Sequence, residues 1–459
     1  MRRYRLVLLG LGMAFAAEAA RAQPIDVPAT WGGSLEARPR LTGAWGGARD
    51  ELGKKGIVLD VDLLLTPQQV VSGGRSTDGD TWGNLEYTLN VDTQKAGWWP
   101  GAFLKFQGIT GFGASVLRDS GAIVPVNTAA LLPGINDHTT ALTNATLMQF
   151  FSEKIGVVLG KLNTLDLGEM EFYGNYQTQF LNEALNSPMT TEQVPISTFG
   201  AGVVALPTKD LTLSALALNP EGTPTSNAVF GSGVLVLASA TLTDRMYGLL
   251  GHGALSFSWS DKERYSLEQD PSNIARLLLF SQFPRLAEPG PILTEILKQY
   301  FPGLLVPTVP PNTKSSSWAL SYSFDQYLWQ PDKRQSKGIG IFLTYGVSDG
   351  NPNPIKFSFT GGIGGKGVVP GRADDTFGLG FATTHFSGAF LPFLREQLAL
   401  GIDHETAFES YYNAALTGWL DLGVDLQVVN PAVKRKLTGT QLTSVDTAVI
   451  AGLRLRARF

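Results

Sequence analysis

The chain has 459 residues, of which 52 are glycine, 43% are hydrophobic and only 17% are charged. This hydrophobic share excludes an intrinsically disordered chain, and a formal net charge of -4 provides no basic surface for nucleic acid. The absence of cysteine excludes disulfide bonds and thiolate metal sites.

Residues 1–22 predict a secretory signal peptide. A basic start with three arginines precedes an apolar run at residues 6–17, and Ala20 and Ala22 form a small-x-small cleavage pattern. The apolar run is too short for a membrane anchor, because a spanning helix needs about twenty residues. We therefore expect an exported mature chain. It begins with an N-terminal periplasmic segment at 23–56, whose short helix is capped by Thr42 and ends at Gly56.

Polar and apolar side chains alternate in many segments of residues 57–459. Leu59, Val61 and Leu63 interleave with Asp60 and Asp62, and the closing segment alternates apolar residues with glycine and arginine. A period of two gives each strand one apolar and one polar face. Several of these segments are long enough to cross hydrocarbon, for which a tilted strand needs about nine to eleven residues. Tryptophans near segment ends indicate interfacial belts, which a soluble β-sandwich lacks.

The count of such segments predicts the architecture. Sixteen segments begin at residues 57, 82, 101, 141, 154, 199, 211, 232, 247, 316, 338, 355, 375, 405, 419 and 447. We predict an all-β fold, a transmembrane antiparallel β-barrel of about sixteen strands, which is wide enough for an aqueous lumen. Short periplasmic turns alternate with long extracellular loops near 115–140, 164–198 and 261–315. Loops of such length can fold inward and narrow the pore.

Residues 41–57, LTGAWGGARDELGKKGI, resemble the opening signature of the carbohydrate-selective outer-membrane porins of the OprB type. Further similar stretches span most of the mature chain: 160–164, 180–185, 374–381, 405–412, 416–417, 430–431 and Phe459. The resemblance implies a bacterial outer-membrane channel for passive diffusion of monosaccharides and polyols into the periplasm, with no cofactor. It implies carbohydrate substrates and outer-membrane lipid as partners, and barrel-assembly machinery that recognises Phe459. Homo-oligomerisation stays open.

The alternation turns both acids and bases toward the lumen: Asp60, Asp62, Glu86, Asn90, Asp92, Lys105, Gln107, Asp325, Glu405, Glu409, Asp421, Asp425, Arg454, Arg456 and Arg458. Such groups can replace the water around a neutral sugar without strongly attracting one sign of ion. Our candidates for sugar contact are Lys105, Gln107, Glu86, Lys161, Asp92, Tyr173, Tyr176 and Arg454. The tyrosines could stack on a pyranose face.

These candidates have structural alternatives. The arginines of the last strand can pair with Asp421 and Asp425 and merely neutralise the wall, and Asp60 and Asp62 can be solvated wall residues. Tyr173 and Tyr176 can equally serve loop packing.

Two other functions stay open at this stage. A general or ion-selective porin would have the same barrel without a sugar site. An outer-membrane hydrolase is more distant, because no G-x-S-x-G motif and no metal-binding histidine spacing occur. His252, followed by Ser256 and Ser258 on one strand face, is the only suggestion of such chemistry. We therefore expect neither an enzyme nor a metal site.

Overall fold

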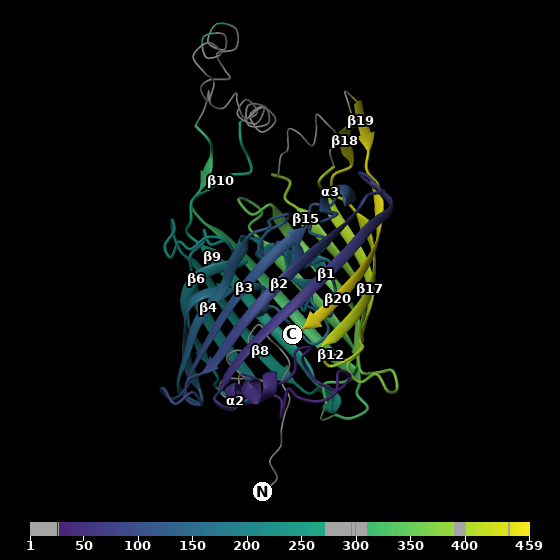
Figure 1. Cartoon of the computed structure of the whole chain (residues 1–459). Coiled ribbons are helices and arrows are strands. Elements are labelled where there is room, and N and C mark those ends of the chain that lie inside the picture. The colour runs from purple at the N-terminus through teal and green to yellow at the C-terminus, as the bar shows by residue number, and fades with distance from the viewer. Residues whose placement is uncertain are drawn as a thin grey trace.

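The computed structural model of the chain describes residue 25 and residues 27–270, 295, 299, 310–333, 335–389, 401–438 and 441–459. The signal peptide predicted for residues 1–22 lies outside this part of the chain. Sixteen of the strands in the described residues form one closed antiparallel barrel, in which each barrel strand pairs with the next and the last pairs with the first (Figure 1).

Sixteen strands in the described residues make up the barrel: β1 (Ile57–Gly74), β2 (Gly79–Asp92), β3 (Ala102–Gly113), β4 (Thr140–Ser152), β5 (Ile155–Asn163), β6 (Ser197–Ala205), β7 (Leu211–Leu218), β8 (Leu235–Asp244), β9 (Gly251–Ser260), β12 (Ser317–Trp329), β13 (Gly338–Ser348), β14 (Ile355–Lys366), β15 (Thr376–Phe386), β16 (His404–Ala415), β17 (Leu420–Asn430) and β20 (Asp446–Arg458). The predicted starts agree with these strands, and the largest offset is 247 against Gly251. The predicted sixteen-stranded transmembrane barrel is confirmed.

The alternation of side chains sets the two faces of the barrel. In β17 the acidic side chains of Asp421 and Asp425 are buried inside, whereas Val424 is 52% exposed on the outer surface. This reverses the arrangement of a soluble protein, because the apolar face is solvated by lipid and the polar face lines the lumen. Closure pairs the backbone groups of every barrel strand with a neighbour, as hydrocarbon requires.

Aromatic side chains mark the two rims of the barrel. Trp259 on β9 and Trp318 on β12 pair across the strands near the ends that carry the long loops, and both are exposed. Trp98 and Trp99 stack on each other at the opposite end, with ring centroids 6.1 Å apart. Such belts hold a barrel at the two membrane–water interfaces.

The remaining described elements are not part of the barrel wall. They are η1 (Trp45–Gly47), α2 (Ala48–Lys54), α3 (Leu117–Ser120), η2 (Thr128–Leu131), η3 (Leu165–Leu167), α4 (Glu183–Asn186), η4 (Met189–Gln193), η5 (Met246–Gly248) and the short strands β10 (Arg264–Tyr265), β11 (Thr313–Lys314), β18 (Arg435–Thr438) and β19 (Gln441–Ser444). No helix in the described part of the chain is both long and apolar enough to cross a membrane.

At the periplasmic end of the barrel, opposite β18 and β19, α2 contacts the junction of β1 and β20, where the barrel closes (Figure 1). We call this junction the seam, and the contacts that Arg49 of α2 makes with it the clasp. Arg49 is only 2% exposed, and its Nη2 donates to Asp60 at 2.7 Å, to the carbonyl of Leu59 at 2.8 Å and to the main-chain oxygen of Phe459 at 3.0 Å. Its guanidinium also lies 4.7 Å from the ring centroid of Trp45. The N-terminal segment thus contacts both closing strands.

Two extracellular loops fold into the lumen. We call residues 164–196, between β5 and β6, the inward loop, and residues 114–139, between β3 and β4, the second loop. Their apolar side chains form clusters inside the barrel with wall residues: Phe172 and Phe180 of the inward loop pack with Phe342 of β13. The loops therefore give this barrel a packed interior on one side.

Candidate functional site

The inward loop is fixed to the far wall by aromatic packing. Phe172 contacts Tyr327 edge-on with ring centroids 4.8 Å apart, and Phe180 contacts Tyr411 in the same way at 4.8 Å. The wall accepts these rings because it carries glycine: a Cβ at Gly340 would lie 2.3 Å from the Phe172 ring. Part of the glycine content is thereby explained by close approach of the loop to the strands.

Two carboxylates of β16 hold the loops by their backbone. Glu409 accepts the N–H groups of Leu181 and Asn182 at 2.5 and 2.9 Å. Glu405 accepts two N–H groups of the second loop at 2.9 and 3.0 Å. Both side chains are at most 4% exposed. Hydrogen bonds to a charged acceptor are stronger than neutral ones, so these acids serve as loop anchors.

Three of the predicted site residues lie together beside the inward loop. Lys105 forms an ion pair with Asp166 of the loop at 2.8 Å. Glu86 accepts a hydrogen bond from Gln107 at 2.8 Å and one from Gln177 of the loop at 3.1 Å. Their polar atoms therefore bind the protein itself, and they connect β2 and β3 to the loop.

Arg454 and Asp92 also make contacts within the protein. Arg454, which is 2% exposed, donates to the carbonyls of Tyr176 and Gln179 at 3.0 and 2.6 Å. Asp92 lies at the periplasmic end of β2, away from the loop, and accepts the N–H of Lys95 at 3.1 Å. The neighbouring arginines of β20 form the ion pairs Arg456–Asp62 and Arg458–Asp421 at 2.5 and 2.9 Å.

The remaining candidates are buried. Lys161 is 1% exposed and donates to the carbonyls of Pro224 and Ser226 at 2.8 and 2.6 Å, so it fixes the loop between β7 and β8. Tyr173 is 1% and Tyr176 is 7% exposed. Burial raises the pKa of Tyr173 to about 12. The structure thus places both rings in loop packing and leaves little of their faces open.

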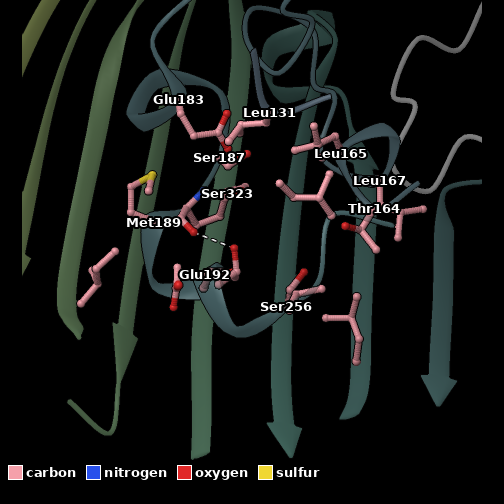
Figure 2. Close-up of a pocket in the computed structure, with 18 of the residues that line it drawn as sticks. Leu131, Thr164, Leu165, Leu167, Glu183, Ser187, Met189, Glu192, Ser256 and Ser323 are labelled. Carbon is pink, nitrogen blue, oxygen red and sulfur yellow. Dashed lines mark hydrogen bonds between the residues drawn. The ribbon is translucent and has the colours of Figure 1, made fainter. Parts of the chain in front are cut away.

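A cavity of about 510 Å³ lies between the inward loop and the wall of β8, β9 and β12. The loop side is mainly apolar and includes Leu165, Leu167 and Met189. Figure 2 shows Met189 on the loop and Ser256 and Ser323 on strands of the wall, and all three line the cavity. A volume in this range suits a small-molecule passage or binding site.

Hydroxyl groups line the strand side of this passage. Ser214, Ser239, Ser256 and Ser321 are successive register partners across β7, β8, β9 and β12. The hydroxyls of Ser214 and Ser239 are 2.6 Å apart. A smaller cavity of about 90 Å³ continues the passage toward β7 and shares Ser256. We call the following set the hydroxyl wall: Thr212, Ser214, Ser239, Thr241, Ser256, Ser321 and Ser323.

Reasoning from the sequence missed the hydroxyl wall. Its residues alternate with apolar ones in β7, β8 and β9, so the signal was present in the period of two. Serine and threonine carry no charge, so in a single sequence they indicate the lumen face less clearly than charged side chains do. The cross-strand register, which brings the four serines into one row, is not visible in a single sequence.

Carboxylates of the inward loop also face the cavity. Glu169, Glu183 and Glu192 line it, together with His252 from β9. Burial raises the pKa of Glu183 to about 7. Burial, with a smaller contribution from the Asp325 carboxylate, raises the pKa of the neighbouring Glu171 to about 7 as well.

The residues suggested for a hydrolase do not form a catalytic unit. Nδ1 of His252 lies 2.8 Å from Asp325, but its buried Nε2 has no hydrogen-bond partner within the described residues. The hydroxyl of Ser258 instead accepts a hydrogen bond from Gln193. No group of His, Asp or Glu side chains in the described chain could hold a metal ion.

Comparisons with known proteins give one family and one group of similar structures. A family model described as carbohydrate-selective porin, OprB family, matches residues 76–459. The fold is similar to the high-pH structure of Pseudomonas putida OprB, with a TM-score of 0.74 and 20% identity over 93% of this chain and 100% of that chain. The low-pH structure of the same protein gives a TM-score of 0.53 and 16% identity, covering 92% and 99% of the two chains. No curated protein sequence matches the chain.

Proposed function

Because this chain belongs to the OprB family of carbohydrate-selective porins, we propose that sugars cross its barrel along the hydroxyl wall, opposite the inward loop. The family and the fold are those of a bacterial outer-membrane sugar channel, which confirms the function and location expected from the sequence. They indicate a channel rather than an enzyme. The residues that contact the sugar form the finer part of the proposal.

The two sides of the passage suit the two kinds of surface on a sugar. The hydroxyls of a sugar can exchange hydrogen bonds with water for hydrogen bonds with the hydroxyl wall, since serine and threonine both donate and accept. The C–H faces of the ring can lie against Leu165, Leu167 and Met189 on the loop side. Each contact is weak, so a sugar can enter and leave by diffusion.

We assign the charged candidates a positioning role. Lys105, Glu86 and Arg454 hold the inward loop through Asp166, Gln177 and two backbone carbonyls. They set the width of the passage by fixing the loop, without touching the sugar themselves. Phe459, whose backbone N–H donates to Val61 in the closed barrel, remains our candidate for recognition by the assembly machinery.

The observation that carries the proposal is the row of four serines across neighbouring strands. Its test uses the purified barrel in planar lipid bilayers, with glucose added to block the ion current. Replacing Ser239 and Ser256 by alanine should raise the half-blocking concentration of glucose about fivefold for each hydroxyl, since one hydrogen bond contributes about 1 kcal/mol.

Ser410→Ala is the matched control, because Ser410 lies on the outward face of β16 between buried Glu409 and Tyr411. Glucose should block the current through this variant at the same half-blocking concentration as through the native barrel. Sucrose should block more weakly than glucose. An ion current that glucose does not reduce at any concentration would favour a general porin over the proposed sugar passage.

A further inference from the structure

The charged side chains that line the cavity include more acids than bases. Glu169, Glu183 and Glu192 all line it, whereas its described lining residues include no lysine and no arginine. An ionised carboxylate can only accept hydrogen bonds. Burial raises the pKa of all three carboxyls, that of Glu183 to about 7, so Glu183 is mostly ionised only above that pH. The ionised passage then offers acceptors with negative charge on the loop side and adaptable hydroxyls on the strand side.

One carboxylate oxygen of Glu183 is buried and has no hydrogen-bond partner in the described structure. Glu183 belongs to α4 of the inward loop, is 6% exposed and lines the cavity, and the oxygen without a partner is Oε2. Figure 2 shows its carboxylate beside Leu131 and Ser187 at one end of the cavity. A buried acceptor without a partner costs free energy unless a donor reaches it. Such a donor can come from a molecule inside the cavity.

Nearby cations offset this charge only in part and from outside the cavity lining: Arg456 and Lys366 interact electrostatically with Glu169. Lys105 and Arg456 are occupied by Asp166 and Asp62, and neither lines the cavity. Arg264 of β10 interacts electrostatically with Glu192, yet it is also absent from the lining.

His252 adds no net positive charge to the cavity. Its Nδ1 lies 2.8 Å from the carboxylate of Asp325, so a protonated imidazole would form a neutral pair with it. The second oxygen of Asp325 accepts the N–H of Glu171 at 2.8 Å, which holds the carboxylate in place. The ionisable groups that line the cavity itself are thus the loop carboxylates and His252.

We propose that the cavity selects sugars by charge, taking amino sugars in their ammonium form ahead of neutral hexoses and rejecting uronic acids and sugar phosphates. This inference rests on the proposed sugar passage and names its preferred substrate class. An ammonium group brings three donors to Glu183 and Glu192, while the hydroxyls of the same ring meet the hydroxyl wall. Carboxylate-lined pores favour cations for the same electrostatic reason.

The test compares three probes of similar size in planar bilayers: glucosamine, glucose and glucuronate. Glucosamine should block the ion current at a concentration about tenfold lower than glucose, which corresponds to about 1.4 kcal/mol. Glucuronate should fail to block where glucose does. A potassium chloride gradient should give a reversal potential of cation-selective sign.

The variants Glu183→Gln and Glu192→Gln remove charge at nearly constant shape. Each should reduce the ratio between the half-blocking concentrations of glucose and glucosamine, and the double variant should bring it close to one. Glu153→Gln, on the exposed turn between β4 and β5, is the matched control and should keep the native ratio. Gel mobility of unheated samples reports whether each barrel is folded, and Glu192→Gln alone tests the inference if the buried Glu183 does not tolerate change.

The outcomes separate the two proposals. Equal block by glucose and glucosamine, or stronger block by glucuronate, would overturn charge selection and leave the sugar passage intact. Absence of block by any of the three sugars would overturn the passage itself. A native ratio in the double variant would show that the preference arises elsewhere than in these carboxylates, which also overturns the inference.

Discussion

Glu183 and Glu171 are acids that the inward loop carries into the barrel and shields from water. Burial raises the pKa of each to about 7, with the Asp325 carboxylate adding to the shift at Glu171. In an undocked, solvated loop these groups would titrate near the ordinary glutamate value of about 4.3. The docked loop therefore favours their protonated forms, and a shift of this size corresponds to about 3 kcal/mol for each group.

We expect the docking of the inward loop to depend on pH with a definite sign. The stabilisation is complete below about pH 4.3 and falls as pH rises through 7, because the docked loop then binds charged carboxylates in a dry environment. The amide protons of Leu181 and Asn182, which Glu409 accepts, should exchange faster at pH 8 than at pH 5 relative to a barrel-strand amide such as that of Leu422.

Glu183→Gln should weaken this dependence, since glutamine has no proton to lose and only Glu171 then titrates near pH 7. Glu153→Gln should leave it unchanged. Loop amides that exchange in a fixed ratio to strand amides across this range would contradict the assigned pKa shifts.

At the level of elements, the clasp between α2 and the barrel seam gives a second prediction. Arg49→Ala would leave the acceptors on Leu59, Asp60 and Phe459 without their buried donor. Removing one partner of a buried charged network typically costs about 3–5 kcal/mol. We expect the variant to convert from the compact to the unfolded gel species at a lower temperature than the native barrel.

Arg49→Lys should recover only part of the loss, because an ammonium lacks the planar fork that reaches several acceptors. Arg245→Ala provides the control, since Arg245 is exposed on the turn between β8 and β9. Equal conversion temperatures for all four proteins would exclude a role for the clasp in holding the seam.

The elements also show what can and cannot be read from a single sequence. The strands were predictable because the lipid and the lumen impose a period of two on each of them, as in β17. The place where the loops dock inside the barrel could not be predicted, because the contact between Glu409 and Leu181 joins residues 228 positions apart. Tyr173 and Tyr176 were predicted as candidates for sugar stacking, yet the folded loop buries both.

Across the whole molecule, the outer surface should be far less tolerant of charge than the interior. Val424 lies midway along β17, faces outward and is 52% exposed. Val424→Arg should destabilise the barrel by about 2–4 kcal/mol, the usual cost of arginine at the bilayer midplane. Reversible unfolding from lipid vesicles by denaturant measures this difference.

Ser239→Arg is the matched substitution on the lumen face of β8. Its side chain meets water, so the free energy of unfolding should change by less than that of Val424→Arg, even though conduction falls. Equal destabilisation by the two arginines would contradict the assignment of the faces.

The open cavity lies along the arc of β7, β8, β9 and β12, whose serines and threonines face it, while the buried carboxylates Glu405 and Glu409 that bind the loop backbones belong to β16. The two tasks, lining the passage and holding the loops, meet on β12, where Ser321 and Ser323 line the cavity while Asp325 and Tyr327 contact the inward loop. Evolution can exchange serine, threonine or small apolar residues on the open arc and so alter what is admitted, without disturbing the packing that keeps the pore in shape. The same division gives a protein engineer a face to redesign and a face to leave alone.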